Sequence, residues 1–288
     1  MFADESAEAV PHMHAFAGKN DYKILEKFDV FACICKFCVL DCGVVMWNDV
    51  SNPILSRKNF RVSDSGEMAT MAGTVNRCLI LLGLVFASAA FSWVSLLASP
   101  VAVGPKVLLF LVLAVVTAVV TCVKKEWSGI TAPLYAVFEG LVLGAISMVF
   151  ELAYHGIVFQ AVMLTFGVAL GMLLLYRSGV IKVTEKFKMV VASALFGIFI
   201  FYAASWILSL FGVSASLSSS TSIFGLVFSA FVVVVAALSL AVDFDFIVEV
   251  SDSGLPKYMS WFAAFGLMVG LVYLYVQILH LLAKLRDR

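Results

Sequence analysis

Charged residues are scarce in this sequence. Asp, Glu, Lys and Arg make up 13% of its 288 residues, whereas soluble domains carry about a quarter. Hydrophobic residues make up 62% of the chain, and the mean hydropathy is +1.05. We therefore expect an integral membrane protein surrounded by the lipid bilayer. Basic and acidic residues number 19 each, and this balance gives no reason to expect a nucleic-acid partner.

Two common catalytic motifs are also absent. The sequence has no H-E-x-x-H, which an intramembrane zinc protease needs, and no G-x-x-x-x-G-K-[ST], which a P-loop ATPase needs. An intramembrane aspartyl protease would need two aspartates facing each other within apolar segments, and the chain supplies one plausible candidate. We expect a protein that is not an enzyme, with no metal site and no resident cofactor. A transient calcium ion is the one small ligand considered below.

Long apolar runs dominate the rest of the chain. Each is close to the ~20 residues that a helix needs to cross the hydrocarbon core. A transmembrane barrel is excluded because its strands would alternate apolar and polar residues, and these runs are continuous. The fold class predicted is an all-α polytopic transmembrane bundle of about seven helices. The runs cover residues 78–98, 107–123, 131–153, 157–176, 189–212, 222–242 and 259–282.

The loops between these runs differ in basic residues. Cytoplasmic loops are enriched in Lys and Arg, and the basic loops alternate with loops that hold only Lys106. The N-terminus is therefore predicted in the cytoplasm, and the C-terminus outside. The basic C-terminal tail fits less well, so a re-entrant final segment stays an alternative. The basic positions of the predicted cytoplasmic side are Arg57, Lys58, Arg61, Arg77, Lys124, Lys125, Arg177, Lys182, Lys186 and Lys188.

The first 50 residues have a different character. They are predicted to form a weakly structured N-terminal extension, followed by the seven-helix transmembrane domain over 51–288. The segment "CICKFCVLDC" places cysteines at 33, 35, 38 and 42. A metal site, lipidated cysteines and a segment without function all stay open, since the spacing matches no established zinc pattern. We also consider that translation starts at Met46, or that the extension is dispensable.

Several motifs from residue 51 onward resemble one family. They are "SNPILSRKNF" at 51–60, "GTVNR" at 73–77, "APLYAVFEGLVLGAIS" at 132–147, "LYRSGVIKVTEKF" at 175–187, "VDFDFI" at 242–247 and "LPKYMSWFAAFGL" at 255–267. In this order they are similar to the bacterial branch of the Bax inhibitor-1 superfamily.

The resemblance implies a seven-helix fold with the last helix packed centrally, in the inner (plasma) membrane of the cell. It further implies a pH-sensitive calcium leak pathway. The alternative that it implies is a non-conducting regulator that binds other membrane proteins, such as a membrane-bound protease.

Two aspartates end the sixth run, in "SLAVDFDFIVEV". Positions two apart on a helix differ by about 200°, so Asp243 and Asp245 face opposite ways and need separate explanations. Asp243 shares a face with Ser239 and Ala236, the small residues that line helix interfaces in membranes. We therefore expect Asp243 to face the bundle interior, and Asp245, the secondary candidate, to be solvated. The plainer alternative places both in the cytoplasmic headgroup zone.

A third acid, Glu139, lies about eight residues into the third run. An ionisable group at this depth usually faces the bundle interior and marks a pathway or a proton site. The plainer alternative is a protonated Glu139 that hydrogen-bonds across a helix interface. Glu139 and Asp243 both fall in the predicted cytoplasmic half, so we expect them to form the ion or proton-sensing site. Two such carboxylates would share a proton at low pH and offer hard oxygen ligands to calcium when both are charged.

The last run departs from the family pattern. The resemblance implies a sensor made of two aspartates, one on the sixth helix and one on the last. Asp243 matches the first, but the last run holds no acid, and Ala264 falls about where the second would be. Calcium gating by this device then requires that Glu139 substitutes. Beside Glu139, Gly140 and Gly144 form a small-xxx-small pair that predicts close packing against a neighbouring helix.

Overall fold

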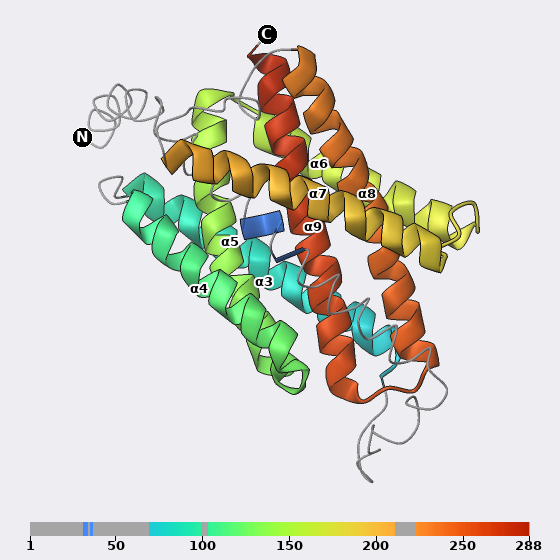
Figure 1. The fold of residues 1–288 in the computed structure, drawn as a ribbon. Helices are drawn as coiled ribbons and strands as arrows, with labels where there is room; N and C mark the ends of the chain where they lie inside the picture. Colours follow the sequence, from blue (N-terminus) through green and yellow to red (C-terminus); the bar gives the residue numbers. More distant parts are fainter. Residues whose placement is uncertain (1–30, 34, 37–68, 99–102, 211–222, 288) are drawn as a thin grey trace.

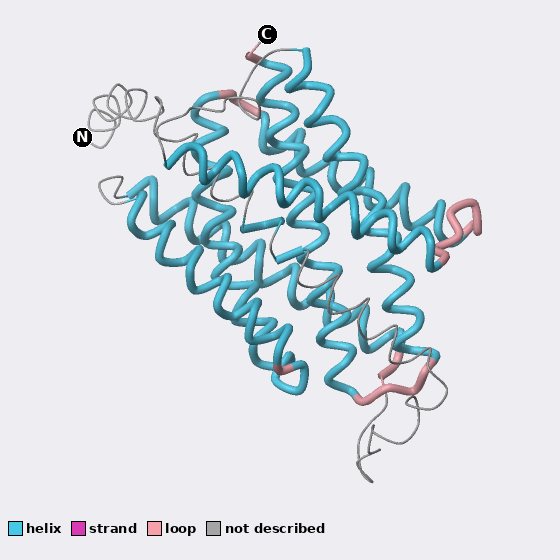
Figure 2. Tube along the Cα trace, in the orientation of Figure 1, coloured by secondary structure: helices cyan, strands magenta, loops and turns pink. Residues whose placement is uncertain are grey.

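The computed structural model describes residues 31–33, 35–36, 69–98, 103–210 and 223–287. Every regular element in these ranges is a helix, and the described turns between helices are short (Figure 2). The elements are α3 (Met71–Ala98), α4 (Val103–Val123), η2 (Lys125–Trp127), α5 (Ser128–Ala153), α6 (Ile157–Arg177), α7 (Glu185–Leu210), α8 (Ile223–Asp252) and α9 (Lys257–Arg286).

The seven α-helices coincide with the seven apolar runs of the sequence. Six of them are long and apolar enough to cross a membrane, and α4 is a shorter apolar helix. The predicted all-α polytopic bundle is confirmed. Each run forms a helix because backbone groups in hydrocarbon must bond within their own segment.

Helix α9 occupies the middle of the bundle (Figure 1). It packs against α3, α5, α6 and α8, and 83% of its apolar span is buried, against 22% for α3 and for α6. The central position of the last helix, which the resemblance implied, is therefore present. Because α9 is one continuous helix of 30 residues, about 45 Å long, it is long enough to cross the membrane without a break.

Close approach of α3 and α5 depends on two glycines. A Cβ added at Gly140 would clash with the Ser88 side chain and the backbone of Val85, and one at Gly144 would clash with the backbone of Ala89. Ser92 Oγ donates a hydrogen bond to the Leu141 carbonyl across the same interface, at 2.8 Å. The predicted packing role of the small-xxx-small pair is confirmed.

The two ends of the bundle are fixed by different contacts. At one end, Ala69 N donates to Leu255 O at 2.8 Å, and Ser128 Oγ donates to Tyr258 O at 2.8 Å. These bonds join the starts of α3 and α5 to the α8–α9 turn. At the other end, an Arg286 guanidinium nitrogen donates to the His155 carbonyl at 2.7 Å, which joins the end of α9 to the α5–α6 turn. The C-terminus thus lies opposite the α8–α9 turn (Figure 1).

Five described residues of the N-terminal region lie inside this bundle. Residues 31–33 and 35–36, called the inner segment below, are helical, and four of the five are buried. The domain boundary at residue 50 stays a prediction, because residues 37–68 lie outside the described part. Cys33 and Cys35 of the cysteine-rich motif are buried, while Cys38 and Cys42 also lie outside the described residues.

Candidate functional site

Asp243 faces the interior of the bundle, as its helical face predicted. The residue is 6% exposed, and Ser239 and Ala236, which share its face, are fully buried. Their small side chains bring α8 close to its neighbours, and Ser239 satisfies its hydroxyl by donating to the Ala236 carbonyl of its own helix at 2.8 Å. A carboxylate in such a place requires a partner, since an isolated buried charge is very costly.

The partner that the structure provides is Lys36 of the inner segment. Lys36 Nζ forms an ion pair with Asp243 Oδ2, and the two side chains are 0% and 5% exposed. The sequence did not predict this residue as the partner, because Lys36 lies outside the apolar runs, in the predicted N-terminal extension, more than 200 positions from Asp243. The signal available was one lysine enclosed by the cysteine-rich apolar motif "CICKFC".

The α9 residue at this ion pair is Gly270. A Cβ added there would clash with Asp243 Oδ2 and with Lys36 Nζ. The expected correspondence of Ala264 with the family's second aspartate stays a prediction. Ala264 is six residues away along α9, and Gly270 leaves the space that the lysine head group fills.

The rest of the inner segment is held by three other helices. Cys33 Sγ lies 3.8 Å from the Leu195 carbonyl of α7 and 4.0 Å from the Tyr273 hydroxyl of α9. Cys35 interacts with the Tyr135 hydroxyl of α5. The inner segment therefore fills the space between α5, α7, α8 and α9.

Glu139 lies on α5, one helical turn after Tyr135. It is 3% exposed, and the Tyr135 hydroxyl, which also interacts with Cys35, interacts with the Glu139 carboxyl. The Tyr135 ring packs edge-on against Phe265 of α9, with ring centroids 5.1 Å apart. Glu139 is thus interior, as expected. Its connection to Asp243 runs through two adjacent residues, Cys35 and Lys36, and the partner that contacts Asp243 is Lys36 rather than Glu139.

Asp245 belongs to a separate cluster at the end of α8. Its carboxylate lies 2.6 Å from Lys188 Nζ of α7 and accepts a 3.1 Å hydrogen bond from the Tyr176 hydroxyl of α6. Glu249 lies 3.9 Å from the same lysine. The side chain of Asp245 is 22% exposed, so the predicted opposite facing of the two aspartates is confirmed, while Asp245 is tied to Lys188 more closely than a fully solvated neighbour would be.

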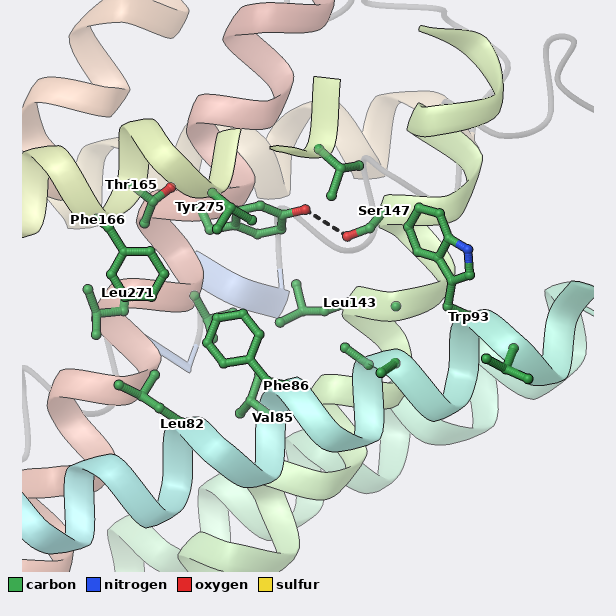
Figure 3. Close-up of a pocket in the computed structure, with 17 residues that line it drawn as sticks. Leu82, Val85, Phe86, Trp93, Leu143, Ser147, Thr165, Phe166, Leu271 and Tyr275 are labelled. Carbon is green, nitrogen blue, oxygen red and sulfur yellow. Dashed lines mark hydrogen bonds between the residues drawn. The ribbon is translucent and has the colours of Figure 1, made fainter. Parts of the chain in front are cut away.

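A second feature is an apolar pocket on the side of the bundle. It has a volume of about 480 Å³ and lies between α3, α5, α6 and α9. Figure 3 shows that Ser147 and Tyr275 meet at one side of it, and their hydroxyl oxygens are 2.7 Å apart. None of the residues that line the pocket carries a charge, and neither Asp243 nor Glu139 is among them.

Metal-ligating side chains do not gather in the described ranges. Within them, no group of three or more His, Cys, Asp or Glu residues is placed to hold a metal ion. At the centre of the bundle, the Asp243 carboxylate faces the Lys36 ammonium.

Comparison with known proteins gives one match. The model of the family described as Bax inhibitor 1 like matches residues 52–287. Comparisons with curated proteins and with solved structures gave no match. The family match covers most of the chain and includes all seven α-helices with Asp243, Glu139 and Gly270, while Lys36 lies before its start. The chain is therefore a multi-pass membrane protein that belongs to the Bax inhibitor 1 like family.

Proposed function

We propose that this protein is a cation leak pathway of the membrane, with calcium as its ion, and that Asp243 is the acid at the centre of the path. The observation that carries the proposal is the Lys36–Asp243 pair, because it is a place inside the bundle where a cation is already held. Membership of the family supports the same reading. No catalytic chemistry is part of the proposal.

The site suits a cation for a simple electrostatic reason. A buried carboxylate without a positive partner is costly in a membrane, so a metal ion would be drawn to Asp243 whenever Lys36 leaves. Carboxylate oxygens are the hard ligands that calcium prefers. Glu139, connected to the pair through Cys35 and Tyr135, would supply a second carboxylate after the inner segment moves.

In this arrangement the path is closed at Asp243 by the chain's own lysine. The groups that face Asp243 are Lys36 from the inner segment, Cys78 from α3 and Gly270 from α9, with Glu139 behind Cys35. Protonation of Asp243 removes the charge that holds Lys36. Acidification is therefore expected to release the lysine and unblock the path, while calcium binds at Asp243 only when the carboxyl is charged, so the pathway is pH-sensitive.

The test is calcium flux into liposomes that contain the purified full chain, measured across pH. Asp243→Asn should remove most of the pH dependence, because the amide cannot titrate. Glu139→Gln should resemble it, and the double variant should add little to either, as expected for residues that act as one unit. Asp245→Asn is the matched control and should change little.

Two results would count against this proposal. Equal effects of Asp243→Asn and Asp245→Asn would show that the interior position of Asp243 is irrelevant to flux. Additive effects of Asp243→Asn and Glu139→Gln would show that the two acids act separately.

The second candidate function is a non-conducting membrane regulator that binds other membrane proteins, such as a membrane-bound protease. The full burial of Lys36 and the near-complete burial of Asp243 favour it. An ion pair that never opens and only stabilises the bundle is expected to be buried in this way. Absence of flux at every pH in the liposome assay, with the chain folded, would replace the leak proposal by this one.

The proposed orientation places the N-terminus in the cytoplasm of a cell with the protein in its inner membrane. The Lys and Arg bias of the loops supports it. Cysteines introduced at Lys125 and Lys182 should be protected from an impermeant reagent applied outside, while one at Leu217 should react. Labelling at position 182 from outside would reverse the orientation.

A further inference from the structure

The pocket between α3 and α6 is open at the side of the bundle. Phe86 of α3 and Phe166 of α6 stack across the gap between their helices, with ring centroids 6.2 Å apart. Both rings are more than 40% exposed, so they form the rim of the pocket. The floor is formed by buried residues, among them Leu143 of α5 and Val272 of α9. In a multi-pass bundle this opening faces the hydrocarbon of the bilayer.

The lining offers very little polar surface to a ligand. Tyr275 and Ser147 bond each other at 2.7 Å, and Thr165 Oγ1 donates to the Ala161 carbonyl at 2.7 Å. Trp93 contributes its apolar ring to the wall (Figure 3). Water is held in cavities by two to four polar partners, and an almost wholly apolar lining does not favour it. An empty pocket would forfeit dispersion contacts, so hydrocarbon is the filling that the lining favours.

We propose that this pocket binds one acyl chain of a membrane phospholipid. Its volume of about 480 Å³ lies within the ~300–1,000 Å³ of ordinary ligand pockets. A free fatty acid would bring a carboxylate, and no lining residue carries a positive charge to pair with it. A phospholipid leaves its head group at the membrane surface and inserts only its tail. The site is independent of Asp243 and of the proposed leak.

Trp93 makes the occupant measurable. In the full chain with its other tryptophans replaced by Phe, Trp93 fluorescence is followed in detergent micelles as phosphatidylcholine with a brominated acyl chain is added. A bound chain should quench Trp93 saturably at low lipid mole fraction. In the reference protein the single tryptophan is moved out of the pocket, by Trp93→Phe together with Phe91→Trp on the lipid-facing side of α3. Its quenching should rise in proportion to the mole fraction of brominated lipid in the micelle.

The matched variants are Ala90→Phe and Ala87→Phe. Ala90 lines the pocket and Ala87 does not, and both side chains are exposed on α3. Ala90→Phe fills the pocket and should raise the mole fraction for half-quenching by about tenfold or more, which is ~1.4 kcal/mol of affinity. Ala87→Phe should leave it unchanged. If Ala90→Phe fails to fold, Val162→Phe fills the same pocket from α6.

A second measurement does not depend on the tryptophan replacements. The native chain, purified in mild detergent, should retain one phospholipid in its intact mass, and the Ala90→Phe protein should not. Quenching of Trp93 in proportion to bulk lipid, equal in both variants, would overturn the proposal. So would saturable quenching by a brominated fatty acid at lower concentration than by the phospholipid, because the ligand would then need its carboxylate.

Discussion

Buried polar groups are paired differently at the centre of the bundle and in its lateral pocket. At the centre, the Asp243 charge is balanced by Lys36, a charge brought from a distant part of the chain. In the pocket, two hydroxyls from α5 and α9 satisfy each other and leave an apolar surface. The first arrangement is held together by opposite charges, which we propose a proton or a competing cation can separate. The second has no charge to titrate and selects only by shape and apolarity.

The largest loss of stability should follow removal of Lys36, the positive partner of Asp243. Starting the chain at Met46, or replacing Lys36 by Met, leaves Asp243 as a buried charge without its partner. Breaking a buried pair by removing one member costs about 3–5 kcal/mol in the free energy of unfolding. Thermal unfolding of the purified protein in detergent measures this. Lys36→Met combined with Asp243→Asn should recover most of the loss, since no unpaired charge then remains.

The matched control for Lys36 is Lys188→Met. Asp245, the partner of Lys188, is 22% exposed and also accepts a bond from Tyr176, so water and the tyrosine hydroxyl compensate for part of the lost pair. The cost should be smaller than that of Lys36→Met. Equal costs of the two substitutions would remove the distinction between the central pair and the peripheral cluster.

A smaller effect is expected at Gly270. Gly270→Ala places a methyl group against Asp243 Oδ2 and Lys36 Nζ, and overpacking of this kind costs about 1–3 kcal/mol in the free energy of unfolding. It should also raise calcium flux, because the methyl group displaces the lysine head group. Gly197→Ala on α7 is the control, since a Cβ there meets no atom within 4 Å. That variant should gain stability, by about 0.5–1 kcal/mol. If Gly270→Ala changed neither the free energy of unfolding nor the calcium flux, the space beside the Lys36–Asp243 pair would not constrain the pair.

The smallest effect should come from the pocket. Tyr275→Phe removes the hydroxyl that meets Ser147 at 2.7 Å and changes the shape of the wall little. One hydrogen bond between membrane helices is worth about 0.6 kcal/mol on average, so the unfolding free energy should fall by about that amount. Ser147→Ala should cost the same, and the double variant little more. A pH-dependent change in flux from Tyr275→Phe would contradict the separation of the two regions.

The family match also separates the two regions. It begins at residue 52, so the pocket and Asp243 lie within it, while Lys36 and the rest of the inner segment lie outside. The acid at the centre therefore belongs to the matched part of the chain, and the lysine that balances it is contributed by the preceding region. The closure that we propose at Asp243 is accordingly a property of this chain's own N-terminal region.

Much of the fold could be predicted from local sequence. Continuous apolar runs of about twenty residues predict membrane helices, because in hydrocarbon only a helix or a closed barrel forms all backbone hydrogen bonds, and barrel strands would alternate. The interior position of Asp243 followed from its small neighbours at helical spacing, and the close approach of α3 and α5 followed from Gly140 and Gly144. These predictions depend on residues within one helix, so periodicity was enough.

Contacts between distant segments could not be predicted in this way. The partner of Asp243, the facing position on α9 and the route from Glu139 to the site each join segments far apart in the chain. The sequence of α9 gave no sign that Gly270 is the residue beside Asp243, which only the packing of α9 shows. A helix period fixes which residues share a face, but it does not fix how far one helix slides along another.

By itself the sequence determined the class of protein, the approximate positions of its seven long apolar helices, and the acids that would be buried. These follow from hydrophobicity and from a helical period, which are local quantities. Only the tertiary structure decided that Lys36 is the counter-charge of Asp243, that Gly270 makes room for it, and that α3 and α6 leave a pocket between them. The physical reason is that buried charge and empty volume are properties of several packed segments together, and no single segment carries the information about which others will surround it.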